Sequence, residues 1–427
     1  MSLKESQKNT FLLVAFLFLL ATSFAIEFSK QKQISTKKTI DFWHYWSGVE
    51  KEPLEKLIDK FNKENHGFKV NLLAISMPRK KILTAIIGNV APDLVHIDND
   101  MASDFALRHA LAAINMEDFP KEKFTPIFLE ALNFKQKQFA MPYLCGSEAM
   151  HYNETIFKEL NLKAPESLED IEQAFSISLS QKDFPIFLPS WPSWFAEVLP
   201  LYFGGDWVDN KGQISANSQA NIEAWQWIEK NFIAKIPEEK ILSFTEGFGA
   251  YQSPDNPFYS QKIALELNGI WEQNLAKNYA PDLKIAVKAF PGKIKNATLV
   301  RIDALAIPKN AKNKKEAQIL LNWLLQKENL EFIALEQKKF TAYKTHSNNF
   351  FAKHENPYIK TFIELAQSKN AKFFPKLSFA NRYKKEIRNA YDQMIRKQKT
   401  AKQALDELQE KVLATVNKRK SEFKVKF

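Results

Sequence analysis

A regular alternation of strand-like and helix-like segments near the start of the chain constrains its fold most strongly. Residues 39–46 are rich in β-branched and aromatic side chains, which predicts a strand. Further strands are predicted at 68–72 and 94–97, with a helix at 79–88 between them. An earlier helix is predicted from an apolar stripe formed by Leu54, Leu57, Ile58 and Phe61. Strands and helices that alternate with short links favour a parallel sheet covered by helices, and therefore an α/β fold.

The same alternation starts again in the second third of the chain. A strand at 150–152 leads into a helix at 154–160, and Ser167 with Asp170 forms a capping pattern for a helix at 167–179. Later elements are predicted at 221–232, 263–267, 284–290, 304–308 and 314–325, followed by a last helix that begins at Thr400. The 427 residues have room for two or three domains, so a second α/β unit is expected.

The first 25 residues have the pattern of an export signal. A basic start precedes the apolar run 11–20, and the small residues Ser23 and Ala25 fit a cleavage site. The apolar run is shorter than the roughly 20 residues that span a bilayer. We therefore predict a signal peptide over 1–25 and a periplasmic protein, which would stay membrane-associated if this segment were not cleaved.

Motifs of the common enzyme and cofactor classes are absent from the sequence. It contains no phosphate-binding P-loop, no nucleophile elbow and no HExxH zinc motif. Cys145 is the only cysteine, so a disulfide within the chain is excluded and a buried position is expected. Asp98, Asp100 and Asp104 lack the glycine and glutamate of a calcium loop. We expect no catalytic residue, no cofactor and no metal site.

The formal net charge of +11 can attract nucleic acid or an anionic membrane surface. The lysines, however, are distributed along the predicted helices, with a local excess only at 418–420 and 424–426. This distribution favours a solvated surface and no nucleic-acid partner. A membrane-anchored interaction protein that uses its basic surface is kept as an alternative.

Aromatic residues in turn-rich segments are the strongest functional signal. The chain has 9 Trp, 11 Tyr and 35 Phe, and several lie among Gly, Asn and Pro at 43–46, 191–194, 207 and 268–271. An aromatic ring covers the apolar face of a sugar, while a few polar groups bond its hydroxyls. Burial in a core is the alternative for any single ring. Carboxylates are also abundant, so a secreted glycoside hydrolase with an acid pair in an aromatic cleft is the enzymatic alternative.

Seven short segments in a fixed order resemble one known family. They are Ile40–Gly48, Pro92–Asp98, Met141–Asn153, Lys262–Trp271, Asp303–Lys309, Glu316–Trp323 and Thr400–Leu405. With them the chain resembles the carbohydrate-binding group of extracellular solute-binding proteins that serve ATP-binding-cassette importers, to which maltose-binding and glycerol-phosphate-binding proteins belong. Gln261 and Arg301 depart from this pattern, because glycine is common at both positions.

The resemblance implies a two-lobed periplasmic-binding-protein fold of type II. Each lobe would hold a mostly parallel sheet flanked by helices, with the ligand cleft between the lobes. In such α/β sheets ligands bind beyond the carboxyl ends of the strands. The implied boundaries are 36–145 plus 303–350 for the first lobe, 148–298 plus 351–427 for the second, and 144–147 and 300–303 for the hinges.

The resemblance also implies a set of ligand-binding residues. Trp271 is expected to stack on the ligand, and Asp98, Glu148 and Asp303 are expected to accept hydroxyl protons. A structural role at the hinge is the alternative for Asp98 and Glu148. Arg301 is the residue to test for contact with an anionic ligand. The full set is Trp46, Ser47, Glu50, Asp98, Glu148, Trp194, Asn268, Gly269, Trp271, Asp303 and Tyr343.

The function implied by the resemblance is the non-enzymatic capture of a sugar or sugar-like solute by closure of the two lobes. The expected partners are the carbohydrate ligand and the membrane permease subunits of the importer, and the protein is expected to be a monomer. The sequence leaves the identity, size and charge of the ligand open.

Overall fold

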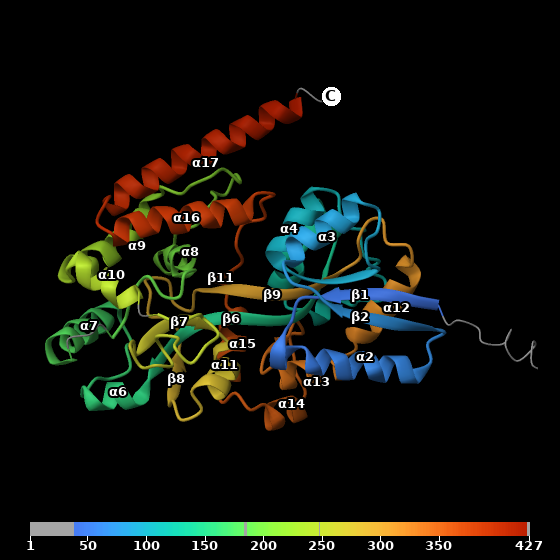
Figure 1. Ribbon diagram of the computed structural model, residues 1–427, viewed down its shortest axis with the longest axis horizontal. Helices are drawn as coiled ribbons and strands as arrows, with labels where there is room; N and C mark the ends of the chain where they lie inside the picture. The colour runs from blue at the N-terminus through green and yellow to red at the C-terminus, as the bar shows by residue number, and fades with distance from the viewer. Residues whose placement is uncertain (1–37, 183–185, 247, 425–427) are drawn as a thin grey trace, which may run out of the picture.

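The chain folds into two lobes that are joined by long strands (Figure 1). The computed structural model describes residues 38–182, 186–246 and 248–424. The predicted signal peptide at 1–25 lies outside the described residues. Each lobe combines strands with covering helices, which confirms the predicted two-lobed α/β class.

The first lobe begins with the predicted alternation. Strands β1 (Lys38–His44), β2 (Phe68–Ala74) and β3 (Leu94–Asp98) alternate with helices α2 (Glu52–Glu64) and α3 (Pro78–Ile87). β1 pairs in parallel with both β2 and β3. The side chains that α2 buries are Pro53, Leu54, Leu57, Ile58 and Phe61. The apolar stripe in the sequence is therefore the face with which α2 packs on the core.

Two long strands, β6 (Met141–Asn153) and β9 (Thr298–Ala306), run from one lobe into the other (Figure 1). They pair antiparallel with each other from Met141 to Ser147, which includes the predicted hinge segments. Toward the second lobe, β6 pairs antiparallel with β7 (Leu265–Gly269) and β8 (Ile285–Lys288). The two lobes therefore share strands as well as a boundary.

Parallel pairing is more restricted than expected. Among the strands of the described chain it is limited to β1 with its two neighbours and to β11 (Ala371–Lys372) with β9, and one isolated parallel bridge joins Phe187 to Leu265. The remaining neighbours of β6 and β9 are antiparallel. The reason is that these two strands cross between the lobes in opposite directions, so each lobe receives one strand that runs against its own β–α–β order.

Helices flank the strands of both lobes. In the first they are α4 (Asn99–Leu107), α5 (Pro126–Ala131), α12 (Lys314–Leu324), α13 (Lys327–Glu336), α14 (Asn348–Lys353) and α15 (Ile359–Ala366). In the second they are α6 (Glu154–Glu159), α7 (Leu168–Lys182), α8 (Phe195–Val198), α9 (Gln219–Asn231), α10 (Glu238–Glu246), α11 (Glu272–Tyr279), α16 (Ala380–Ile395) and α17 (Ala401–Lys424). The short strands are β4 (Asn133–Phe134), β5 (Lys137–Gln138) and β10 (Phe340–Thr341). Both predicted capping patterns are present, since Ser167 Oγ accepts from the Asp170 amide at 3.1 Å and Thr400 Oγ1 from the Gln403 amide at 3.2 Å.

Each lobe has its own large hydrophobic core. The first core draws mainly on residues 40–149 and 300–366, and the second mainly on 150–299 and 374–412. Cys145 is buried in the first core, as expected. Trp207, one of the candidate sugar-stacking rings, is fully buried in the second. Because α15 packs in the first core, we infer that the chain leaves the first lobe after α15 and not at residue 350.

Two further findings bear on function. None of the helices within 38–182, 186–246 and 248–424 has both the length and the apolar character that a bilayer crossing requires. Within the same ranges, no cluster of three His, Cys, Asp or Glu side chains is arranged to hold a metal ion.

Candidate ligand-binding site

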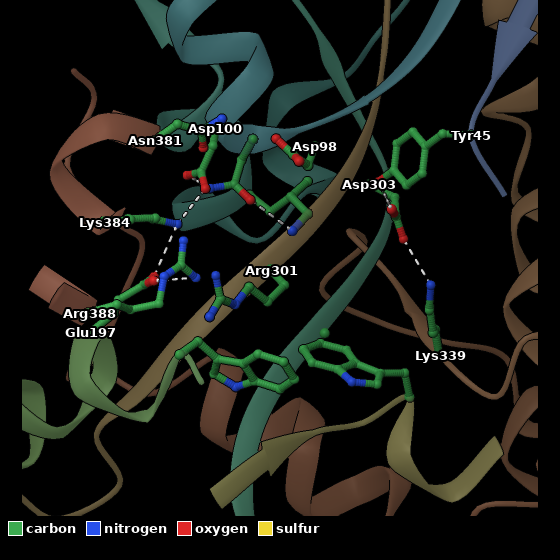
Figure 2. A pocket seen from close by; sticks show the side chains of 15 residues that line it. Tyr45, Asp98, Asp100, Glu197, Arg301, Asp303, Lys339, Asn381, Lys384 and Arg388 are labelled. Carbon is green, nitrogen blue, oxygen red and sulfur yellow. Dashed lines mark hydrogen bonds and ion pairs between the residues drawn. The ribbon is translucent and has the colours of Figure 1, made fainter. Parts of the chain in front are cut away.

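A cavity of about 370 Å³ lies between the lobes, above the crossing strands (Figure 2). The first lobe contributes Tyr45, Asp98, Asn99, Asp100 and Lys339, and the crossing strands contribute Gly146, Arg301, Ile302 and Asp303. The second lobe contributes Trp194, Glu197, Trp271, Asn381, Lys384 and Arg388. The cavity thus has polar and aromatic walls that come from both lobes.

Asp98 is the acid that the first lobe presents without a paired cation. It ends β3 and caps α4, where its Oδ1 accepts from the Met101 amide at 2.6 Å. Among the described residues it forms no ion pair, unlike its neighbour Asp100. Burial and the charge of Asp100 both raise the pKa of Asp98. Its second oxygen is therefore available to a hydroxyl donor in the cavity.

Asp303 lies on β9 and is held by three side chains. Its Oδ1 accepts from the Tyr45 hydroxyl at 2.9 Å and lies 3.3 Å from His96 Nε2, and its Oδ2 is 3.0 Å from Lys339 Nζ. Burial would raise the pKa of Asp303, but the charge of Lys339, its hydrogen bond and the contact with His96 together outweigh burial and hold that pKa well below its usual range. Asp303 is consequently a fixed, ionised acceptor.

Arg301 forms the floor of the cavity. Its guanidinium contacts Glu148 Oε1 through two nitrogens, at 2.7 and 2.8 Å. Glu148 lies opposite on β6 and has no exposed surface, whereas a quarter of the Arg301 side chain is exposed. Burial raises the pKa of Glu148 and Arg301 opposes that rise, while the charge of Glu148 raises the pKa of Arg301 against its own burial. The pair ties the two crossing strands together where the lobes meet.

An ionic cluster joins the lobes at one end of the cavity (Figure 2). Lys384 on α16 forms an ion pair with Asp100 on α4, so a second-lobe helix contacts a first-lobe helix. Lys384 also lies 3.6 Å from Glu197, which pairs with Arg388 at 3.0 Å. Lys384 therefore neutralises acids from both lobes at once.

Two indole rings form the wall that the second lobe contributes. The rings of Trp194 and Trp271 meet edge to face with 6.3 Å between centroids. Trp271 Nε1 donates to the Tyr251 hydroxyl at 2.8 Å, while the buried Nε1 of Trp194 has no partner within the described chain. A Cβ on Gly269 would lie 2.1 Å from Trp271 Cη2. Glycine is thus required there because the indole lies against the backbone of β7.

The predicted site residues fall into three groups. Asp98, Trp194, Trp271 and Asp303 line the cavity. Glu50, Glu148 and Gly269 lie behind that lining and contact it: Glu50 approaches Lys339 at 3.3 Å, Glu148 binds Arg301 and Gly269 supports Trp271. Asn268 lies further back, because it accepts from the Tyr251 hydroxyl, which in turn accepts from Trp271 Nε1. Trp46, Ser47 and Tyr343 are placed elsewhere.

The three remaining residues are placed away from the cavity for identifiable reasons. Trp46 is only 3% exposed and packs on His96 with 4.2 Å between ring centroids, so Tyr45 faces the cavity in its place. Ser47 is exposed at the start of a short 3₁₀ helix. The Tyr343 hydroxyl donates to the Leu325 carbonyl at 2.9 Å, and its ring packs on Phe124.

Several lining residues were not expected from the sequence. Tyr45 and Asp100 lie one and two positions from residues that were predicted, so the strand ends were located correctly but the facing side chain was not. Asn381, Lys384 and Arg388 recur every three or four residues and therefore share one face of α16. That spacing was a usable signal for a common face, but nothing in it indicated that the face lines the cleft.

A two-lobed α/β molecule with one polar and aromatic cavity between its lobes belongs, as a class, to the binding proteins of periplasmic type. A family model described as bacterial extracellular solute-binding protein matches residues 56–343. Because this match covers more than half of the chain, the protein belongs to the family of bacterial extracellular solute-binding proteins.

The individual relatives and solved structures share only about a fifth of their residues with this chain. The multiple sugar-binding protein of Streptococcus mutans is 23% identical over 304 residues, which are 67% of this chain and 71% of that protein. An ABC substrate-binding protein from Listeria monocytogenes in complex with cycloalternan has a TM-score of 0.74 at 18% identity, covering 89% of this chain and 99% of that one. The extracellular solute-binding protein of Staphylococcus aureus in complex with maltose has a TM-score of 0.68 at 20% identity, covering 89% and 98%. These structures share the fold.

Proposed function

We propose that the protein captures a sugar in the cavity between its lobes and delivers it to the permease of an ATP-binding-cassette importer. The observation that carries this proposal is the combination of the Trp194 and Trp271 rings with the acceptors Asp98 and Asp303 in one interlobe cavity. Rings cover the apolar face of a sugar, and carboxylates accept from its hydroxyls. The names of the relatives, which include a multiple sugar-binding protein and a maltotriose-binding protein, support the same ligand class.

The charges of the cavity favour an uncharged ligand. Four cations line it, and each has a carboxylate partner: Arg301 with Glu148, Lys339 with Asp303, Lys384 with Asp100, and Arg388 with Glu197. An anionic ligand would have to compete with these internal partners for every cation. Asp98 has no such partner, because Arg301 is paired with Glu148 behind the lining, so Asp98 remains as an acceptor that suits hydroxyl groups.

Because the walls of the cavity come from both lobes, closure of the lobes explains how a ligand would be captured. A ligand that contacts rings from the second lobe and acids from the first does so fully only when the lobes are closed, so binding shifts the open–closed equilibrium by its differential affinity. The closed form would present both lobes together to the permease. We further propose export to the periplasm, action as a monomer and no catalytic turnover; the relatives named above are binding proteins.

The test is a ligand screen coupled to a shape measurement. The exported chain is titrated by calorimetry with maltose, maltotriose and mannotriose, and with sugar acids and polyol phosphates as charged competitors. We expect a neutral oligosaccharide to bind and to reduce the radius of gyration in small-angle scattering. Failure of every neutral sugar to bind or to compact the protein would reject the proposal. Release of chromophore from nitrophenyl glycosides would favour the glycoside hydrolase instead.

A further inference from the structure

A second polar cluster lies in the second lobe, directly behind the aromatic wall. It contains Glu266 and Asn268 on β7, Glu272 at the start of α11, and Tyr251 and Trp191 from the preceding connections. Both glutamate side chains are fully buried. In the described part of the chain neither of them is paired with a lysine or an arginine, and the side-chain amide of Asn268 bridges the two carboxyl groups. This is an unusual place for two acids.

The cluster is connected to the cavity by a short chain of hydrogen bonds. Asn268 Nδ2 donates to Glu266 Oε1 at 2.9 Å and to Glu272 Oε2 at 2.7 Å. The Tyr251 hydroxyl lies 3.0 Å from Glu272 Oε2 and accepts from Trp271 Nε1 at 2.8 Å. Trp271 also immediately precedes Glu272 in the chain. A displacement of the Glu272 carboxylate therefore reaches the cavity wall through Tyr251 and through the backbone.

The acid pair has to keep at least one proton at neutral pH. Two buried carboxylates bridged by one amide repel each other strongly, and no cation of the described chain is paired with them. Burial and the neighbouring charge of Glu272 raise the pKa of Glu266 well above its usual value, and burial raises the pKa of Glu272 to about 7. Glu266 therefore keeps its proton, whereas Glu272 loses its proton near neutrality.

The titratable groups around the acid pair keep their charge state over the pH range in which Glu272 loses its proton. Burial raises the pKa of Tyr251 and of Tyr259, whose ring stacks on that of Tyr279, so both hydroxyls stay protonated. Burial lowers the pKa of His151, opposite Glu266 on β6, to about 4, so its imidazole stays neutral. Glu148, opposite Gly269, is paired with Arg301. The charge of this region therefore changes through the acid pair.

We propose that Glu266 and Glu272 are positioning residues, which through Asn268 and Tyr251 keep the Trp271 indole in the wall of the ligand cavity while both are protonated. Ionisation of Glu272 strengthens the bond from the Tyr251 hydroxyl and draws that hydroxyl toward the carboxylate, which displaces Trp271 and weakens binding. The consequence for affinity rests on the proposed sugar-binding function, but the effect on Trp271 itself does not. The indole lies against the backbone at Gly269 and its Nε1 is bonded to Tyr251, so movement of Tyr251 changes the ring's position.

The decisive experiment needs no ligand. The protein is labelled with 5-fluorotryptophan, the Trp271 resonance is assigned with Trp271→Phe, and fluorine spectra are recorded from about pH 5.5 to about pH 8.5. We expect the Trp271 resonance to shift with a midpoint near neutrality, while that of Trp225, buried in the second core, stays in place. A Trp271 resonance that does not move over this range overturns the proposal.

Two variants distinguish the contribution of the acid pair from that of the Tyr251 hydroxyl, which connects the pair to Trp271. Glu272→Gln keeps the hydrogen-bonding shape without the charge and is expected to abolish the shift of the Trp271 resonance. Tyr251→Phe removes the connecting hydroxyl and is expected to abolish it too. Glu154→Gln is the matched control, because Glu154 also begins a helix but is exposed, and it should leave the shift unchanged. A shift that persists in Glu272→Gln contradicts the assignment.

Affinity supplies the second readout. In the wild type, the association constant for maltotriose should fall about tenfold between about pH 6 and about pH 8, because the binding-competent fraction falls by that factor when one group ionises near pH 7. In Glu272→Gln the change should be less than about twofold. A Trp271 resonance that titrates in a protein that binds no sugar would keep the positioning pair and reject the sugar-binding proposal. Sugar binding by a protein whose Trp271 resonance does not shift with pH would keep the sugar-binding proposal and reject the positioning pair.

Discussion

Two acidic clusters border the cavity, and their carboxyl groups are stabilised in different ways, one by cations and the other by neutral donors. On the crossing strands, Glu148 is paired with Arg301 and Asp303 with Lys339. Behind the aromatic wall, Glu266 and Glu272 have only neutral donors as hydrogen-bond partners. The pKa of the partly buried Asp303 is held well below its usual range, while that of the fully buried Glu266 is raised well above it.

The difference shows that the partner, and not burial alone, decides the protonation state of an acid in this protein. The cation-paired cluster keeps ionised acceptors such as Asp303 at the cavity surface. The acid pair, in contrast, forms a largely neutral scaffold that holds an aromatic ring. The stability contributed by the cation-paired cluster should therefore fall when a countercharge is removed, whereas that contributed by the acid pair should change with pH. Each of the following predictions tests one side of this comparison.

The largest effect is expected from Glu148→Ala, which leaves Arg301 without its countercharge. Removal of one partner of a buried ion pair costs roughly 4 kcal/mol of the free energy of unfolding. Urea denaturation of the ligand-free protein measures this loss. Lys402→Met, which breaks the exposed pair with Asp406, is the control and should cost less than about 0.5 kcal/mol. Equal losses in the two variants would show that the Glu148–Arg301 pair contributes no more than a surface pair.

The acid pair predicts a pH dependence of stability with a definite sign. The folded-state pKa of Glu272 lies above its unfolded value, so its contribution is complete below about pH 4.5 and is lost as pH rises through about 7. Relative to Glu272→Gln, the wild type should lose about 3 kcal/mol of unfolding free energy over this interval, since each pKa unit corresponds to about 1.4 kcal/mol. Parallel denaturation series of both proteins measure it. A constant difference between them would contradict the raised pKa.

Replacement of the ring itself should have the next largest effect, this time on affinity. Trp271→Ala removes a cavity-lining aromatic surface and should weaken sugar binding by about 2 kcal/mol, or roughly thirtyfold. Trp271→Phe keeps an aromatic face but loses the bond to Tyr251, and should lose less. Calorimetry with the sugar found in the screen measures both. Equal losses would mean that the bond to Tyr251, and not the ring face, carries the contribution.

Local features of the sequence were sufficient to predict much of the fold. The α2 stripe, the caps at Ser167 and Thr400 and the strand ends before Asp98 were predicted, because each depends on residues a few positions apart. The restricted parallel pairing was not predicted, since it depends on strands shared by two lobes. The packing of α15 in the first core was not predicted either, since it depends on contacts between distant segments.

Four predicted residues line the cavity, and they were indicated in different ways. Asp98 ends β3 and Trp271 lies two positions after β7, so a strand end marked both. Trp194 was indicated by its turn-rich aromatic segment, and Asp303 by the family resemblance. Trp46 did not face the cavity, because a shift of one position decides whether Tyr45 or Trp46 points into the core. Lys384 depends on how α16 packs against the other lobe, and the partner of Glu148 depends on the pairing of β6 with β9. Such contacts between distant segments leave no local pattern in the sequence.

The smallest effect is expected where the ionic cluster bridges the lobes. In Lys384→Met, Asp100 of the first lobe and Glu197 of the second lose the cation that lies between them, so their repulsion favours the open form. Sugar affinity should fall by about 1 kcal/mol, or roughly fivefold, with a larger radius of gyration in the ligand-free protein. The exposed neighbour Lys385→Met is the control for the lost charge. If both variants scatter and bind like the wild type, Lys384 contributes nothing to closure and the cation-paired cluster acts within the crossing strands alone.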